Sequence, residues 1–218
     1  MRVPDNRQNE ATRQALLAAA APIFARDGYQ IARIRDIAAA ASVNLSAINY
    51  HFGSKQGLYE AVLANTTEAA ITAHPLIPEK HRDDPVEVRF HILVANMLAR
   101  FVDVGQPSLM AKLMVREMAN PTTALDVVID QVSKPQFAIT SGLIAELLGP
   151  AATEQRVRHC TLSLLGQVVF YLFARPLVNR LFPITYDPNH IQQLSEHIAQ
   201  FSLAGIQQYR SQAAKDGE

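Results

Sequence analysis

The sequence has very little cysteine. Cys160 is its one cysteine, which excludes an internal disulfide and fits a reducing cytoplasm. The residue stands in an apolar helical stretch, where a buried, inert thiol explains it better than a nucleophile does. Redox or thiol chemistry is therefore not expected.

Long hydrophobic runs are also lacking. The most apolar run, residues 161–174, is shorter than the roughly 20 residues that a membrane-spanning helix needs, and Gly166 and Gln167 interrupt it. Residues 2–10 are polar and lead straight into a helical pattern, unlike a signal peptide. We therefore expect a soluble, cytoplasmic protein with no membrane partner.

An excess of charge of either sign is absent. The chain has 20 Lys and Arg residues and 20 Asp and Glu residues, so its formal net charge is zero. Any binding to nucleic acid must then depend on a local patch rather than on a basic coat. Apolar residues make up 49% of the 218 residues, enough for the core of one large domain or two smaller ones.

Signs of catalysis are lacking as well. No paired carboxylates, Ser/His/Asp arrangement or Gly-rich phosphate loop stands out. His74 and His81 are too widely separated to form a metal site by themselves. We expect no enzyme activity, no cofactor and no metal. Strand-like alternation is missing too, and the sequence predicts an all-α fold.

The most informative stretch is 34–58, IRDIAAAASVNLSAINYHFGSKQGL. Apolar residues at i, i+3, i+4 and i+7 from Ile34 predict one helix with a single buried face. A turn-prone break at 42–44 separates it from a second short pattern with Ile48 and Phe52 inward. Ser54 is a candidate N-cap for the helix that follows. This pattern predicts a helix-turn-helix, whose second helix can enter a DNA major groove.

A further set of residues in this region is ordered and spaced as in a known family: Ala20–Gly28 (AAPIFARDG), Ile37, Ala38, Ala41, Val43, Tyr50–Phe52, Lys55 and Leu58. On these positions the chain resembles the TetR family of transcriptional regulators over about residues 10–65, and INYHFGSKQGLY is similar to its CecR-like branch. The chain departs from the family pattern at three places. The family usually has Thr or Ser capping the second helix where Ala32 and Arg33 stand, Gly at Ser42, and Tyr at Asn49.

The predicted DNA-binding residues lie on and beside the helix 46–52. Asparagine can bond adenine bidentately, and Ala or Leu can pack on a thymine methyl group, while side-chain donors hold phosphates. The full set is Arg33, Arg35, Leu45, Ser46, Ala47, Asn49, Tyr50, His51 and Lys55. Alternatives remain for some of them: Tyr50 and His51 as partial core, Lys55 as a solvated lysine, and Asn49 as an ordinary surface residue.

Helical patterns continue to the end of the chain. The expected helices are 10–27, ended by Gly28 and bent at Pro22, a helix from 34, then 46–52, 54–73, 85–103, 108–120, 122–148 with a kink or break at Pro135, 153–174, and a last helix from 187 or 189. A loop rich in proline and charge, residues 74–85, separates the fourth from the fifth. We expect a DNA-binding domain at 1–65 and a helical effector-binding and dimerisation domain at 66–218.

The resemblance implies a homodimer in which the last two helices of each subunit form a four-helix bundle. The residues agree, because the helix 161–174 is apolar on all sides, which predicts burial on every face and a contact with another subunit. A dimer also presents two recognition helices to a pseudo-palindrome.

The resemblance further implies a small-molecule pocket among the middle helices. Polar or adaptable side chains in apolar helices are its candidate lining: His91, Asn96, Met114, Arg116, Glu117, Gln136, His159, Gln167 and Tyr171. Structural roles compete with this interpretation. Arg116 and Glu117 fit an ion pair or a solvated position, His91 and His159 fit satisfied core histidines, and Met114 fits plain core.

These observations predict a homodimeric repressor that a small-molecule effector releases from a pseudo-palindromic operator. Two other classes compete with it: an all-helical small-molecule-binding enzyme, and a helical interaction module without sequence-specific DNA binding. A gel shift across a salt series separates the regulator from the module. Steep salt dependence with a sequence preference supports a regulator.

Overall fold

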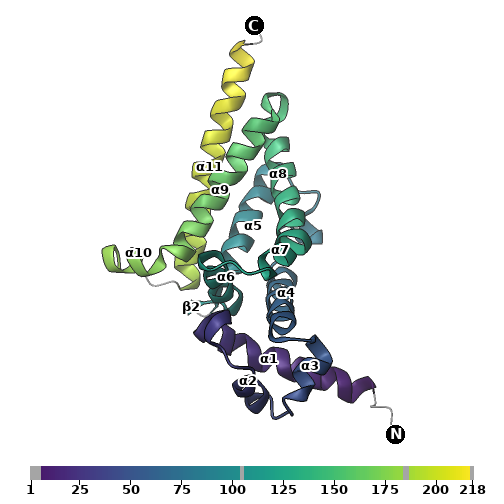
Figure 1. Ribbon diagram of the computed structural model, residues 1–218. Coiled ribbons are helices and arrows are strands. Elements are labelled where there is room, and N and C mark those ends of the chain that lie inside the picture. The colour runs from purple at the N-terminus through teal and green to yellow at the C-terminus, as the bar shows by residue number, and fades with distance from the viewer. Residues whose placement is uncertain (1–5, 104–105, 184–186, 217–218) are drawn as a thin grey trace. The chain divides into compact units, whose positions relative to one another are not determined.

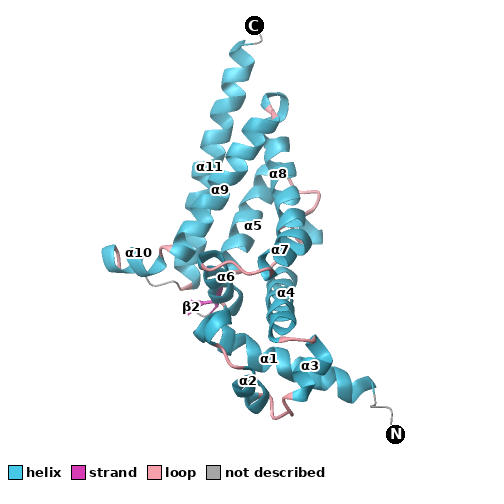
Figure 2. Ribbon diagram, viewed as in Figure 1, coloured by secondary structure: helices cyan, strands magenta, loops and turns pink. Residues whose placement is uncertain are grey.

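The computed structural model describes residues 6–103, 106–183 and 187–216, and these form helices almost throughout (Figures 1 and 2). The α-helices are α1 (Asn6–Ile31), α2 (Ile34–Ala40), α3 (Ser46–Phe52), α4 (Lys55–Ala73), α5 (Val86–Ala99), α6 (Leu109–Ala119), α7 (Ala124–Val128), α8 (Lys134–Leu148), α9 (Glu154–Phe173), α10 (Arg175–Leu181) and α11 (Pro188–Asp216). Two 3₁₀ turns, η1 (Glu79–His81) and η3 (Gly149–Ala151), and a π-helix, η2 (Ile129–Ser133), complete them. The all-α prediction is confirmed.

One small exception to the helical fold follows α5. The strand β1 (Val102–Asp103) pairs with β2 (Gln106–Pro107) in an antiparallel ladder of two residues each. Such a short pair carries no alternating apolar pattern that a sequence reading could detect.

The chain divides into two compact units. The first contains the chain up to Ala70 together with Leu109–Val132, and the second contains Ile71–Ser108 together with Ser133 onwards. Residues 109–132, which the sequence analysis assigned to the second domain, therefore pack with the helix-turn-helix. The reason is chemical, because α6 and α7 bury their apolar side chains in the core of the first unit.

The first unit is built around α1 and α4. Leu16 and Phe24 of α1 and Leu58 and Tyr59 of α4 are fully or almost fully buried, and the Phe24 and Tyr59 rings meet edge-on at 4.9 Å. The α-helical backbone of α1 is interrupted at Gly28, where φ is 76° and ψ is 168°. This is the predicted helix end, since glycine enters a left-handed φ without a steric cost.

Two charged residues of α6 fasten it to the rest of the first unit. Glu117 is 1% exposed, and its carboxylate accepts hydrogen bonds from the Tyr59 hydroxyl (2.8 Å) and from the backbone N–H (2.6 Å) and hydroxyl (2.9 Å) of Thr122. Arg116 donates from Nε to the Ala25 carbonyl (2.7 Å) and from Nη2 to the carbonyl of the next residue. Both side chains therefore hold helices together.

The second unit is a bundle of α5, α8, α9 and α11. Phe90, Leu93, Ile144, Leu164 and Ile198 come from all four helices and are 0–1% exposed. Helix α5 runs along α11 and lies against α8 and α9. Each helix thus buries one apolar stripe in a shared core, as amphipathic helices do.

Some element boundaries differ from the sequence predictions. Helix α1 begins at Asn6, four residues before the predicted start at residue 10, and residues 1–5 lie outside the described part. The predicted helix 122–148 is interrupted close to Pro135, as expected: α7 ends at Val128, the π-helix η2 follows, and Pro135 lies in the first turn of α8, where its missing N–H costs no helical hydrogen bond. Helix α10 was not predicted at all, and Pro176 occupies its first turn in the same way.

No single helix in the described residues has both the length and the apolar content to cross a membrane. Only α9 and α10 taken together meet that requirement, and the chain bends by 74° between them.

Candidate DNA-binding site and candidate ligand groove

Helix α2 begins without a side-chain cap. Arg33 occupies the N-cap position with an extended backbone (φ −105°, ψ 130°), and its side chain makes no capping hydrogen bond. Asp36 lies in the first turn, where a negative charge faces the positive end of the helix dipole. Because Ile37 and Ala38 fill the core, the exposed side chains of Arg33 and Arg35 are left outward.

The turn between α2 and α3 contains a strained residue. Ser42 has a φ of +55°, the one positive φ at a non-glycine residue in the described chain. This is the position where the TetR resemblance leads one to expect Gly, and a left-handed backbone supplies the reason. Two residues later, the Asn44 Oδ1 accepts a hydrogen bond from the Ser46 backbone N–H at 3.1 Å. Asn44 therefore ties the turn to the start of α3.

Helix α3 buries one side and exposes the other. Ile48 is fully buried, and Phe52 and Ala47 pack partly against the same core. The remaining predicted base-contacting residues, Leu45, Ser46 and Asn49, are exposed. The exposed side of α3, which we call the recognition face (Leu45, Ser46, Asn49), thus offers an amide and a hydroxyl beside a small apolar surface. Groups of these kinds can read major-groove edges.

Tyr50 and His51 extend this face. Tyr50 is 67% exposed, which removes the partial-core interpretation for this residue. Its hydroxyl accepts a long hydrogen bond (3.4 Å) from the Asn9 side chain of α1. His51 is half-buried and its ring meets the Tyr50 ring edge-on at 5.0 Å. The two rings therefore lie together in α3, and a tyrosine hydroxyl and a histidine N–H are groups that can donate to phosphates.

Lys55 is held by the end of α1. Its Nζ donates to the Gln30 carbonyl at 3.2 Å and lies 4.9 Å from the centre of the Tyr29 ring. Partial burial lowers the pKa of the Lys55 ammonium. An ammonium has three N–H donors, so one internal hydrogen bond leaves donors for a phosphate and fixes where they point.

A close approach follows directly after α3. A Cβ placed at Gly57 would lie 2.1 Å from the Phe52 carbonyl oxygen, a distance that real side chains do not tolerate. Glycine at this position lets the first turn of α4 touch the last residue of α3. The junction therefore sets the angle between α3 and α4.

The predicted ligand-binding residues are not brought together. Met114, Arg116 and Glu117 belong to the first unit, where Met114 packs against the core. In the second unit His91 lies beside a Glu196 carboxylate oxygen (3.3 Å), and the Asn96 amide donates to the Pro75 carbonyl (2.7 Å). The Gln136 side chain accepts from Arg100, which the sequence analysis missed.

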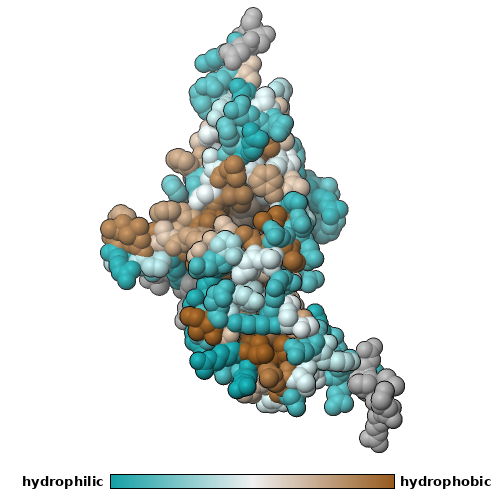
Figure 3. All heavy atoms as spheres, in the orientation of Figure 1, coloured by the Kyte–Doolittle hydropathy of each residue, from teal (hydrophilic) through white to brown (hydrophobic). Residues whose placement is uncertain are grey.

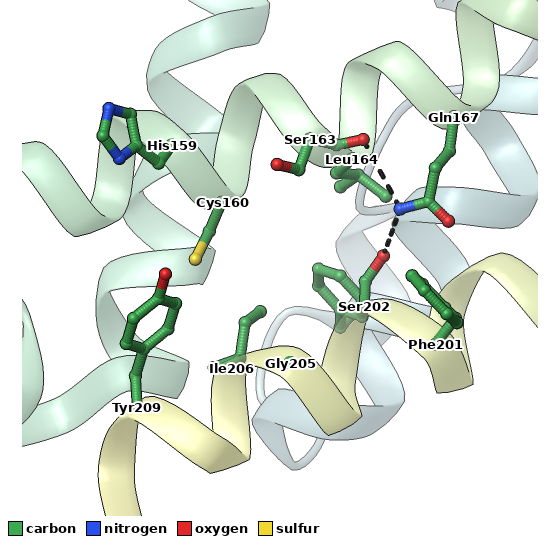
Figure 4. Close-up of a pocket in the computed structure, with 11 residues that line it drawn as sticks. His159, Cys160, Ser163, Leu164, Gln167, Phe201, Ser202, Gly205, Ile206 and Tyr209 are labelled. Atoms are coloured by element: carbon green, nitrogen blue, oxygen red, sulfur yellow. Dashed lines mark hydrogen bonds between the residues drawn. The ribbon is translucent and has the colours of Figure 1, made fainter. Parts of the chain in front are cut away.

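His159, Gln167 and Tyr171 do line hollows along α9 and α11. The first, of about 210 Å³, has His159, Cys160, Ser163 and Gln167 on α9 opposite Phe201, Ser202 and Tyr209 on α11 (Figure 4). Gln167 crosses it, donating to the Ser202 hydroxyl (3.1 Å) and to the Ser163 carbonyl (3.4 Å). The second, of about 540 Å³, includes Tyr171, Phe170 and His197. Burial raises the pKa of the Cys160 thiol, which keeps it protonated.

An apolar surface accompanies these hollows. Phe170 and Phe173 of α9 and Phe201 of α11 are 53%, 37% and 65% exposed, and Leu162, Leu177, Leu181 and Phe182 are more than half exposed. Figure 3 shows hydrophobic side chains gathered over α10 and the adjoining part of α9. The sequence predicted burial on every face of this helix. Within one chain, α9 buries Thr161, Leu164 and Val168 and leaves the other apolar side uncovered.

No three His, Cys, Asp or Glu side chains come together as metal ligands in residues 6–103, 106–183 and 187–216. Sequence analysis did not indicate the structural roles of Asn9 and Arg100. Asn44 does lie in the turn predicted at 42–44, since asparagine favours turns and helix starts. Arg100 carried only its position at the end of an apolar run.

Comparisons with known proteins agree with this geometry. Residues 16–62 match the family "Bacterial regulatory proteins, tetR family", and residues 86–206 match the C-terminal domain of the "HTH-type transcriptional dual regulator CecR". CecR of Shigella flexneri is 30% identical over 180 residues, 78% of this chain and 80% of that protein. UidR of Escherichia coli K12 is 29% identical over 128 residues, 55% of this chain and 60% of that protein.

Solved structures share the fold at lower identity. The structure of FadR of Bacillus subtilis, in complex with stearoyl-CoA, has a TM-score of 0.68 at 15% identity, and the match covers 88% of this chain and 98% of that chain. A TetR-like regulator of Rhodococcus sp. RHA1 has a TM-score of 0.66 at 19% identity, covering 94% of this chain and 100% of its own. The chain belongs to the TetR family of transcriptional regulators, with a C-terminal domain of the CecR type.

Proposed function

We propose that this regulator is a homodimeric repressor that binds a pseudo-palindromic operator through α3 and is released by a small-molecule effector. The observation that carries the proposal is the two-sided character of α3. Ile48 is fully buried, while Ser46, Asn49 and Tyr50 are exposed and able to hydrogen-bond. A helix of this kind, held by a rigid core, suits insertion into a major groove.

The proposed dimer contact is the apolar surface of α9 and α11. Isolated surface hydrophobics are ordinary, but a contiguous group of large ones marks an interaction site. Phe170 and Phe201 line the same hollow from the two helices, so a second copy covering this surface would bury both. Two heads related by a twofold axis would then read two half-sites about one helical turn, or a multiple of it, apart.

The proposed effector response needs two states with different operator affinity. A ligand shifts the population only by its differential affinity for them, and about 1–3 kcal/mol of coupling is typical. The FadR structure holds stearoyl-CoA, which supports ligand binding within this fold. CecR is described as a dual regulator, so activation at some promoters is the alternative outcome of the same DNA binding.

The test is a gel shift of the purified chain with its own upstream DNA between low and physiological salt. A repressor of this type binds one fragment preferentially and loses affinity linearly in log salt, because phosphate contacts release counterions. Deleting one half-site should cost most of the affinity. Weak binding to all fragments, with no dependence on half-site spacing, would refute the proposal and favour a helical interaction module.

A further inference from the structure

One arginine in the second unit is buried, and its hydrogen-bond acceptors among the described residues are neutral. Arg100, at the C-terminal end of α5, is 9% exposed. Its Nε donates to the His74 carbonyl at 2.8 Å, and its Nη1 donates to the Gln136 side-chain oxygen at 2.9 Å. Its Nη2 is enclosed by protein and has no hydrogen-bond partner among the described residues.

This arrangement is unusual for a guanidinium. Arginine is almost never buried unless it is paired, and removing a charge from water is costly unless an opposite charge compensates. The neutral acceptors and the negative end of the α5 dipole offset part of that cost. Burial lowers the pKa of Arg100 to about 10, so the group is still charged at neutral pH. A positive charge with a free N–H edge therefore remains inside the unit.

Glu117 in the first unit shows the contrast. Its buried carboxylate receives three hydrogen bonds, from Tyr59 and Thr122, so it is saturated by its own chain. Arg100 is left with a donor edge on Nη2, and an edge formed by Nη1 and Nη2 matches a carboxylate or a phosphate. The unsatisfied group in the second unit is thus one that an anion would complete.

Core residues lie close to Arg100 and to His74 along the chain. Leu98 of α5 and Leu76, which follows the His74 carbonyl by two residues, are 3% and 2% exposed core residues. Gln136 lies in the first turn of α8, directly after the π-helix η2. Such irregular turns occur often at functional sites. A ligand group that reaches Nη2 would therefore enter a part of the second unit where apolar side chains are buried.

We propose that Arg100 is the anion-binding residue of the effector site, and that the effectors are small amphiphiles with an apolar body and one carboxylate or phosphate group. The proposal rests on the proposed function only in calling the ligand an effector. Binding itself can be measured on the purified chain without DNA.

The test compares three probes of equal chain length, decanoate, decyl phosphate and decan-1-ol, by titration calorimetry at concentrations below aggregation. A charged partner for Nη2 should favour at least one anion over the alcohol by about tenfold or more. Decanoate and decyl phosphate distinguish a carboxylate from a phosphate effector. Equal binding of all three probes, or binding of none, would overturn the assignment.

Variants then locate the preference. Arg100→Gln should reduce the ratio of anion to alcohol affinity to about one, while the matched control Arg82→Gln, at an exposed arginine paired with Glu79, should leave it unchanged. If Arg100→Gln unfolds, Arg100→Lys keeps the charge but loses the planar fork, and its ratio should fall between wild type and one. An anion preference that survives undiminished in a folded Arg100 variant refutes the proposal.

The operator gel shift without any probe separates the two proposals. A chain that binds its operator but shows no anion preference overturns the role of Arg100 alone. A chain that prefers the anionic probes but binds no operator supports the anion site and overturns the repressor function.

Discussion

The two units of the chain differ in how completely their buried polar groups are hydrogen-bonded and in whether their exposed helix sides are polar or apolar. In the first unit the buried polar side chains Thr67 and Glu117 are hydrogen-bonded within the chain, and the exposed side of α3 is polar. In the second, Arg100 keeps an unpaired nitrogen and the exposed sides of α9 and α11 are apolar. The first unit thus pairs these buried polar side chains internally, whereas the second has a buried donor and an apolar surface that its own described residues leave unpaired or uncovered.

The largest expected effect tests the uncovered apolar surface. Phe170→Asp combined with Phe201→Asp places two charges where we expect the second copy to pack, so the protein should become monomeric in analytical ultracentrifugation. Operator affinity should fall by about 100-fold or more, because two linked heads bind far better than one. Val88→Asp, at an exposed apolar residue of α5, is the matched control. A double variant that stays dimeric would show that α9 and α11 do not form the contact.

The next prediction removes a hydrogen bond from the buried Glu117 carboxylate, so that the first unit also contains an incompletely paired buried charge. Tyr59→Phe removes one donor from the buried Glu117 carboxylate and should lower the free energy of unfolding by about 1–3 kcal/mol, measured by urea titration. Tyr50→Phe, at an exposed tyrosine, is the control and should change it little. If both variants unfold at the same urea concentration as wild type, the Glu117 network does not stabilise the fold.

The same pair of residues gives a pH dependence. Burial, with the Glu117 hydrogen bond and charge adding to it, raises the pKa of the Tyr59 hydroxyl above its usual value. A raised pKa means that the stabilisation is complete below a pH of about 10 and declines above it, as the unfolded tyrosine ionises. The stability advantage of wild type over Tyr59→Phe should therefore shrink in urea titrations above pH 10. An advantage that grows there would mean that the sign is wrong.

Smaller effects are expected at the recognition face. Lys55→Gln keeps a donor for the Gln30 carbonyl but removes the charge, so binding to all fragments should weaken by several-fold and the salt slope should fall by about 1. Asn49→Ala should instead relax the preference at one base pair, by about 1–3 kcal/mol. Gel shifts with single-base operator variants measure both. If Lys55→Gln left both the affinity and the salt slope unchanged, the only role of Lys55 would be its hydrogen bond to the Gln30 carbonyl of α1.

The smallest effect concerns the turn. Ser42→Gly should raise the free energy of unfolding by about 0.5–1 kcal/mol, because glycine accepts a positive φ without the strain that serine bears. The control Ala39→Gly, at an exposed position inside α2, should lower it by a similar amount. Thermal unfolding of the two variants in parallel gives the comparison. A destabilised Ser42→Gly would show that the serine side chain contributes more than its backbone costs.

Sequence patterns predicted the helices well where the apolar period was clear. The predicted bounds 46–52 of α3 agree with the structure, and α4 and α9 are within one residue at each end. Helix α10 was not predicted because it is only seven residues long and buries Val178 alone, while its Leu177 and Leu181 are exposed, so no amphipathic pattern marked it. The strain at Ser42 was foreshadowed only by the family's preference for glycine there.

The candidate site was predictable in part for a similar reason. Exposure of Asn49 and Tyr50 follows from placing Ile48 and Phe52 in the core, which helical spacing dictates. Helical spacing gave no comparable way to predict which polar residues of the middle helices would meet at a ligand site. Glu117 and Asn96 bind their own chain, while Arg100 became visible only once its three donor nitrogens could be counted.

The order of residues alone determined the all-helical class, the helix-turn-helix and the side of α3 that faces outward, because these depend on spacing within a single helix. Tertiary structure decided which buried charge is satisfied, that 109–132 pack with the N-terminal helices, and that α9 keeps an uncovered apolar side. Those outcomes depend on contacts between residues far apart in the chain, and local periodicity does not specify them.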